Sequence, residues 1–424
     1  MAHRPLGHLR NLPRGAGGSH RRAATEKAMS PEALAKVSKR SFPDPYSFLP
    51  NALLNWLRPY SRGILQRKVP FPKPSPADIR ALPETTTIAI AGDWGTGTEE
   101  AARIAELMEQ DACDYTIHLG DVYYVGDESS IKENCEGKKE GNYTPVRWPR
   151  GRFGTFALNG NHEAYARDGA YFNWIRHSLR QQSSCFVLYS EHWLLLGLDT
   201  GYYSVGIPWI GWLAEHFGYP ALMPSCRLPQ ETMDWLRADV QPLLNSRGIV
   251  ILSHHQYFSS FDNEYRNAAR QLASIDSLTD RPVLWLWGHE HRLAAYDLFG
   301  EEGMKAYGRC LGHGGMPVDR GNAVKRSRPL QFYDDRSYEP EKVAGEPEKY
   351  SERIVKESTE FGVNGYALLS FSGPNLGIGY RDISGQEIVR ENWSAEYGHV
   401  RPTTPTILGR TVQLTADHRL IMAD

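Results

Sequence analysis

Five short polar clusters, each directly after an apolar and often β-branched run, constrain the fold of this chain more than any other feature. The runs at residues 87–91, 115–119, 156–158, 249–252 and 283–287 are typical of buried strands. Directly after them come, in chain order, Asp93, Asp121, Asn161, His254, and the pair His289 and His291. Because ligands of α/β sheets bind beyond the carboxyl ends of the strands, these side chains are expected at one site. Carboxylate, amide and imidazole groups together suit first-row metal ions.

The order and spacing of these clusters resemble those of the calcineurin-like metallophosphoesterase superfamily. The clusters read GDWG, GDVYY, GNHE, ILSH and GHEH, and the resemblance covers roughly residues 85–315. The common superfamily form of the first cluster, GD-x-H, has a metal-binding histidine where this chain has Gly95. In the purple acid phosphatase branch the tyrosine of GD-x-x-Y, here Tyr124, replaces that histidine. The resemblance implies an α/β (α+β) fold, a four-layer αββα sandwich of two mixed β-sheets flanked by helices.

The resemblance also implies a dinuclear metal centre that is bridged by Asp121. The first ion would be bound by Asp93, Asp121, Tyr124 and His291, and the second by Asp121, Asn161, His254 and His289. A phenolic donor with a pKa of about 10 in water favours Fe(III) at the first site, and the second donor set suits divalent Zn, Mn or Fe. Alternatively, Tyr124 packs in its loop, and Tyr123 or water fills its place.

Further polar residues beside the clusters are candidates for other roles. By the same resemblance His162 is no metal ligand, and it is expected to stabilise the transition state or to act as a general acid. His255 and His313 are candidates for the substrate rim, with a purely structural role as the alternative. Glu163 and Glu290 are expected to be structural, through hydrogen bonds to the backbone or to the ligands.

These residues predict a metal-dependent phosphoric ester hydrolase, similar to an acid phosphatase. Two metal ions neutralise the phosphate oxygens and acidify a bound water, so a metal-bound hydroxide would attack a phosphate monoester. One alternative is a phosphodiesterase acting on nucleotide or lipid head-group substrates, and another is a non-catalytic binding protein on the same fold. The metal ligands do not separate these substrates, because loops such as 202–229 and 316–360 would select them.

The distribution of charge, cysteines and apolar runs bears on the expected binding partners and cellular location of the protein. The chain of 424 residues has a net charge of −2, but residues 1–40 carry nine Lys or Arg against two Glu, which leaves the remainder at −9. The acidic remainder is therefore not expected to bind nucleic acid. The resemblance implies a small phosphate ester as the partner, and the oligomeric state stays open. The five Cys are scattered, and neither a secretory signal nor a membrane-spanning run is recognisable, so a cytoplasmic protein is expected.

The chain divides into four expected segments. They are a disordered basic tail (1–40), an N-terminal arm with a Pro-rich linker (41–84), the metallophosphoesterase domain (85–392), and a C-terminal extension (393–424). Helices are expected over residues 99–110, 168–179, 230–244 and 263–273. Residues 128–149 are expected to form a loop, and the charged insert 319–360 an exposed excursion.

Overall fold

The computed structural model describes residues 68–140, 145–204, 224–318, 320, 324–338 and 361–423. The expected tail (1–40), most of the arm, and parts of the two expected inserts lie outside the described residues. No helix among the described residues is long and apolar enough to span a membrane.

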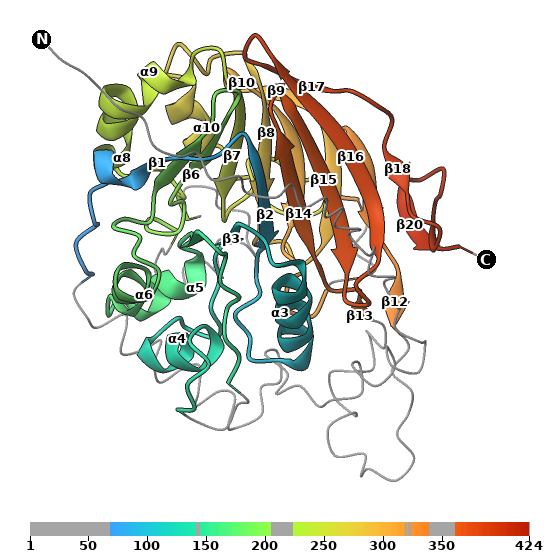
Figure 1. Cartoon of the computed structure of the whole chain (residues 1–424), viewed down its shortest axis with the longest axis horizontal. Helices are drawn as coiled ribbons and strands as arrows, with labels where there is room; N and C mark the ends of the chain where they lie inside the picture. The colour runs from blue at the N-terminus through green and yellow to red at the C-terminus, as the bar shows by residue number, and fades with distance from the viewer. Residues whose placement is uncertain are drawn as a thin grey trace, which may run out of the picture.

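One of the two large sheets contains eight strands, five of them from the C-terminal part of the chain (Figure 1). Its order is β17-β16-β15-β14-β2-β3-β4, with β18 paired to β16. The strands are β2 (Thr85–Ala91), β3 (Tyr115–His118), β4 (Gly154–Ala157), β14 (Gly365–Ser372), β15 (Asn375–Asp382), β16 (Glu387–Glu396), β17 (His399–Pro402) and β18 (Ile407–Leu408). Since β2, β3 and β4 are parallel, their carboxyl ends lie at the same edge.

The other large sheet contains ten strands in the order β1-β5-β6-β7-β8-β10-β9-β11-β20-β19. The strands are β1 (Ile79–Ala81), β5 (Phe186–Tyr189), β6 (Trp193–Gly197), β7 (Gly248–Ser253), β8 (Pro282–Trp287), β9 (Leu293–Glu301), β10 (Met304–Leu311), β11 (Leu330–Asp334), β19 (Val412–Leu414) and β20 (Arg419–Met422). The neighbours β7 and β8 are parallel, so their carboxyl ends also meet at one edge.

The packing of apolar side chains confirms the expected four layers. The central core joins the two sheets and includes Ile90 and Ile117 from one and Leu195 and Leu284 from the other. A second core lies between the ten-stranded sheet and the helices α8 (Gln230–Trp235), η3 (Leu236–Val240), α9 (Gln241–Leu244) and α10 (Asn267–Leu272). A third core lies between the eight-stranded sheet and the helices α3 (Glu99–Asp111), α4 (Glu128–Asn134) and α6 (Ala170–Ser178).

Helix α3 illustrates how the local sequence sets these elements. The Thr98 side chain accepts a hydrogen bond from the backbone N–H of Ala101, which caps the first turn. Ile104 and Met108 lie four residues apart, and both are buried under the eight-stranded sheet. The helix ends where Ala112 adopts a left-handed conformation (φ 48°). The Thr98 cap and the apolar spacing are readable in the sequence, which predicted a helix over residues 99–110.

Two expectations about irregular regions were wrong. Helix α4 occupies the start of the region expected to be a loop, because the Asp127 side chain accepts a hydrogen bond from Ser130 N (3.0 Å) and Ile131 is buried. Within the insert expected to be exposed, β11 joins the ten-stranded sheet, and β12 (Ser337–Tyr338) pairs with β13 (Phe361–Gly362). Residue 392, the expected end of the metallophosphoesterase domain, lies inside β16. The chain beyond it adds strands to both large sheets.

Candidate metal centre

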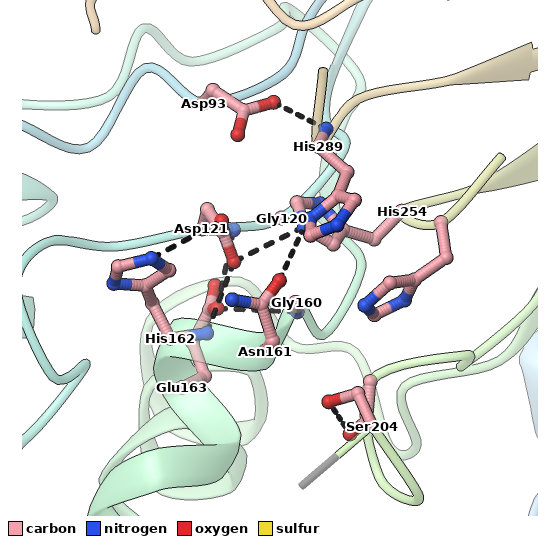
Figure 2. A network of polar contacts seen from close by, with 12 residues as sticks. Asp93, Gly120, Asp121, Gly160, Asn161, His162, Glu163, Ser204, His254 and His289 are labelled. Carbon is pink, nitrogen blue, oxygen red and sulfur yellow. Dashed lines mark hydrogen bonds and ion pairs between the residues drawn. The ribbon is translucent and has the colours of Figure 1, made fainter. Parts of the chain in front are cut away.

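The candidate ligands meet at the carboxyl ends of five strands, as Figure 2 shows for most of them. Asp93 follows β2, Asp121 follows β3, Asn161 opens helix α5 (Asn161–Ala166) after β4, His254 follows β7, and His289 follows β8. Asp93, Asp121 and His254 are at most 1% exposed. Carboxylates are rarely buried in this way unless a cation or hydrogen-bond donors compensate them.

Three of these residues have backbone angles that non-glycine residues rarely adopt. The φ angle is 56° at Asp93, 72° at Asp121 and 68° at His289. Such left-handed conformations cost free energy and are concentrated at functional sites. Each sharp turn comes directly after a strand, so it can direct the side chain over the strand end.

One group of side chains contains a phenolic oxygen. The Tyr123 hydroxyl oxygen lies 2.9 Å from Asp93 Oδ1 and 3.3 Å from Asp121 Oδ2. The same oxygen lies 3.0 Å from His291 Nε2. His291 Nε2 is in turn 3.5 Å from Asp93 Oδ1. These four residues could therefore surround a single ion.

The structure places Tyr123 in this group, where Tyr124 was expected. The chain turns after β3, with a left-handed φ of 72° at Asp121, and this turn brings the Tyr123 hydroxyl back to the Asp121 carboxylate. The backbone N–H of Tyr123 donates to Gly95 O (2.8 Å), which fixes this segment against the first cluster. Tyr124 instead offers its backbone carbonyl, which lies 2.6 Å from His162 Nδ1. The motif spacing selected Tyr124, with Tyr123 as the alternative, because spacing alone does not give the direction of a side chain that follows a sharp turn.

A second group lies on the other side of Asp121. His254 Nε2 is 3.1 Å from Asn161 Oδ1 and 3.2 Å from Asp121 Oδ1. The ring centroid of His289 lies 5.2 Å from that of His254, and its Nδ1 is buried and has no hydrogen-bond partner among the described residues. Since Asp121 Oδ2 contacts Tyr123 and Asp121 Oδ1 contacts His254, the carboxylate faces both groups at once. This is the arrangement that a bridging carboxylate requires.

The electrostatics of the centre favour bound cations. The pKa of His254 rises to about 9, because the nearby Asp121 carboxylate outweighs the opposing effect of burial. The pKa of Asp121 lies well below its usual range, although burial acts to raise it. Buried carboxylates thus draw positive charge into this space, and His289 Nδ1 supplies a buried lone pair without another partner. The residues fit a pair of metal ions.

His162 lies beside Asp121 on the side away from His254 (Figure 2). Its backbone N–H donates to Asp121 Oδ1 (3.1 Å), and its Nε2 is 3.7 Å from Asp121 Oδ2. Its Nδ1 is occupied by Tyr124 O, so Nε2 is the ring nitrogen left for chemistry. Burial lowers the pKa of this imidazole. The geometry suits a proton donor beside the centre.

The remaining candidates are buried and form structural contacts. Glu163 Oε2 accepts hydrogen bonds from the backbone N–H groups of Gly160 and Asp121, each 3.1 Å away. Glu290 Oε2 accepts a hydrogen bond from Ser259 (2.7 Å). The Glu163 contacts are of the expected kind, whereas the partner of Glu290 is a serine side chain that is not a proposed ligand.

The two histidines considered for the substrate rim are also buried. His255 is 3% exposed, and its Nδ1 lies 3.0 Å from Thr200 Oγ1. Its ring centroid is 4.6 Å from that of His289, so it adjoins the second group. His313 is 2% exposed, and its carbonyl accepts the backbone N–H of Gly365. The backbone of His313 is therefore hydrogen-bonded to the first residue of β14.

Sequence reasoning missed two tyrosines that contact candidate ligands. Asn161 Nδ2 donates to the Tyr165 hydroxyl oxygen (2.9 Å), and His289 Nε2 lies 3.4 Å from the Tyr265 hydroxyl oxygen. The spacing of four residues between Asn161 and Tyr165 within a helix was a usable signal. No comparable spacing links Tyr265 to His289.

Comparison with known proteins identifies the domain. Residues 86–293 match the family model of the calcineurin-like phosphoesterases. No curated protein matches the chain significantly. Among solved structures, the chain is similar to GAP50, the anchor in the inner membrane complex of Plasmodium, with 13% identity and a TM-score of 0.46 over 74% of this chain and 89% of that one.

Two further solved structures show a similar degree of likeness. Purple acid phosphatase PPD1 from yellow lupin (Lupinus luteus) seeds has 12% identity and a TM-score of 0.46, over 78% of this chain and 58% of that one. PhoD has 12% identity and a TM-score of 0.45, over 80% of this chain and 74% of that one. Identities this low concern the fold alone, so the assignment rests on the family model. Residues 86–293 therefore form a domain of the calcineurin-like phosphoesterase family.

Proposed function

We propose that this protein hydrolyses phosphate monoesters at a centre that holds two metal ions. The observation that carries the proposal is the position of Asp121, whose two carboxylate oxygens face two separate groups of ligands. When bound, the two ions would neutralise the phosphate oxygens and acidify a water molecule. The preference for monoesters rests on the resemblance of the five clusters to the purple acid phosphatase pattern.

Each proposed ion has its own set of donors. Asp93, Asp121, His291 and the Tyr123 hydroxyl would hold the first ion, with Tyr123 in place of Tyr124. A phenolate is a hard anionic donor, so Fe(III) suits this site. The second set is Asp121, Asn161, His254 and His289. Its neutral amide and two imidazoles suit divalent Zn, Mn or Fe.

His162 would supply the proton for the leaving group. Its Nδ1–H donates to the carbonyl of Tyr124, which orients the ring and stabilises the protonated form. The proton on Nε2 would then face the leaving alkoxide oxygen. Burial lowers the pKa of this imidazole, and Asp121, 3.7 Å from Nε2, partly offsets that effect by attracting the charged form. The carbonyl of Tyr124 thus orients His162 as the proton donor, and His162 itself is not a proposed metal ligand.

Paired assays test the proposal. The purified protein, loaded with iron and zinc or with manganese, is given nitrophenyl phosphate and bis-nitrophenyl phosphate. We expect turnover of the monoester to exceed turnover of the diester. Faster turnover of the diester would make the protein a phosphodiesterase. No turnover of either compound by protein that binds two ions would favour a binding role and overturn the proposal.

A further inference from the structure

Besides the bridging Asp121, the second ion has three proposed ligands, and each of the three has a second polar atom that faces away from the ion. For Asn161 this atom is Nδ2, because Oδ1 lies against His254. For His254 it is Nδ1, and for His289 it is Nε2, because His289 Nδ1 is the buried nitrogen without a partner. A ligating oxygen or nitrogen needs a lone pair, so the outer nitrogen must carry the hydrogen.

All three outer nitrogens have an acceptor. The nitrogen of His254 donates to the backbone carbonyl of Leu119 (3.0 Å). The amide of Asn161 donates to the Tyr165 hydroxyl oxygen (2.9 Å). His289 Nε2 lies 3.4 Å from the Tyr265 hydroxyl oxygen, a longer contact of the same kind. Two of the three ligands are therefore oriented by a tyrosine side chain and not by the backbone.

Helix α5 positions the first of these tyrosines. Tyr165 is four residues after Asn161 and three after His162, so all three side chains lie on neighbouring positions of one helix face. The ring of Tyr165 packs 5.0 Å from the ring of His162. This packing limits the movement of the hydroxyl, and the amide of Asn161 is held with its oxygen toward His254.

The segment between β7 and α10 positions the second tyrosine. The backbone N–H of Tyr265 donates to Gln256 O (3.1 Å), which ties the segment back to the end of β7. Its ring centroid lies 5.0 Å from that of His255 and 5.6 Å from that of His289. The hydroxyl is thereby directed at the outer nitrogen of His289.

We propose that Tyr165 and Tyr265 are positioning residues that set the affinity of the second metal site. Without the Tyr165 oxygen, the Asn161 amide can rotate and present its NH₂ group, which cannot bind a metal. Without the Tyr265 oxygen, the proton of His289 can move to Nδ1 and block that lone pair. The two hydroxyls contact Asn161 and His289, which belong to the second set, so the effect is expected at the second ion. The inference rests on the proposed ligand sets.

The test measures metal affinity in the absence of substrate. Metal-free wild type, Tyr165→Phe and Tyr265→Phe are titrated with zinc against a chromophoric chelator. We expect each variant to bind the second ion about 10- to 100-fold more weakly, the usual cost of losing such a partner of a ligand. Affinity for the first ion should stay unchanged. Tyr202→Phe is the control, because the Tyr202 hydroxyl donates to Val69 O (2.9 Å) and not to a ligand.

Three results would be decisive. Unchanged affinity for the second ion in both tyrosine variants, with two ions bound by the wild type, would overturn the role of the tyrosines alone. Equal weakening at both sites, or a lowered unfolding temperature of the metal-free variants, would indicate a general structural defect and overturn it as well. A wild type that binds fewer than two ions would overturn the ligand sets, and with them the proposed function.

Discussion

The Tyr123 hydroxyl oxygen lies 3.0 Å from His291 Nε2, and the same oxygen is 2.9 Å from an Asp93 carboxylate oxygen. Tyr123 is 3% exposed, so water does not readily replace these contacts. A buried phenol between a carboxylate and an imidazole is well placed to lose its proton to a strongly Lewis-acidic ion. The position compensates for Gly95, which has no side chain to offer.

We predict that Tyr123→Phe removes the colour of the iron-loaded, oxidised protein. A phenolate bound to Fe(III) gives a charge-transfer band in the visible range, and phenylalanine cannot form that bond. The measurement is an absorption spectrum together with the iron content. The neighbouring variant Tyr124→Phe is the matched control and should keep the band, because Tyr124 offers a backbone carbonyl toward His162. Loss of the band in the control alone would restore Tyr124 as the ligand.

Replacement of the bridging carboxylate should affect both ions. We predict that Asp121→Ala abolishes turnover and lowers the metal content at both sites, because each oxygen of Asp121 faces a different group. Metal analysis of the purified variant checks this. Activity retained with two bound ions would remove Asp121 from the bridging position.

Replacement of His162 should separate chemistry from metal binding. We predict that His162→Ala lowers kcat by about 10²- to 10⁴-fold, the usual range for a general acid or base. Metal content should stay at the wild-type level, since the ring nitrogens of His162 face Tyr124 O and the flank of Asp121. If the variant loses a metal ion, His162 has a different role.

Five buried strands, and the meeting of most candidate site residues beyond their ends, were predictable from the sequence. Each predicted ligand except the tyrosine follows a strand whose apolar run is continuous, and continuous runs mark strands buried on both faces. The resemblance supplied the four layers. The motif predicted Tyr124 with Tyr123 as the alternative, and the contacts of the Tyr123 hydroxyl favour the alternative, because a motif records spacing and not the direction of a side chain.

Other features depended on contacts that are distant in sequence. Strand β11 lies in a charged segment, but it pairs with β9 and β20, and this pairing outweighs its local composition. Tyr265 reaches His289 across 24 positions in a segment without periodicity. The left-handed turns at the ligands also run against local preference, as is common at functional sites.

Acid stability should depend on Asp114. Although burial opposes the shift, hydrogen bonds from Thr87 and the ion pair with Arg152 hold the pKa of Asp114 below 3.8. A lowered pKa in the folded state stabilises the protein above the unfolded-state pKa, and this contribution is lost as the pH falls through the folded-state value. We predict that Asp114→Asn lowers the free energy of unfolding at pH 6 and flattens its decline below pH 4. If the free energy of unfolding falls equally steeply below pH 4 in the wild type and the variant, the prediction is wrong.

The ion pair between Arg309 and Glu391 joins the two sheets through the core. Arg309 Nε and Nη2 donate to the two oxygens of Glu391 at 2.8 and 2.7 Å, and the Tyr380 hydroxyl donates to Glu391 Oε2 at 2.7 Å. Arg309 is fully buried and Glu391 is 4% exposed. Replacement of one partner therefore leaves an uncompensated charge in a medium that solvates it poorly.

We predict that Arg309→Met lowers the free energy of unfolding by about 3–5 kcal/mol, measured by urea denaturation of the metal-free protein. The matched control is Arg270→Met, because Arg270 pairs with Glu302 at 2.8 Å while its side chain is 55% exposed. That change should cost about 0–1 kcal/mol, as solvent screens the pair. The double variant Arg309→Met with Glu391→Leu should recover much of the loss, because it removes both buried charges. A single variant as stable as the control would show that water or a rearranged partner solvates Glu391 between the sheets.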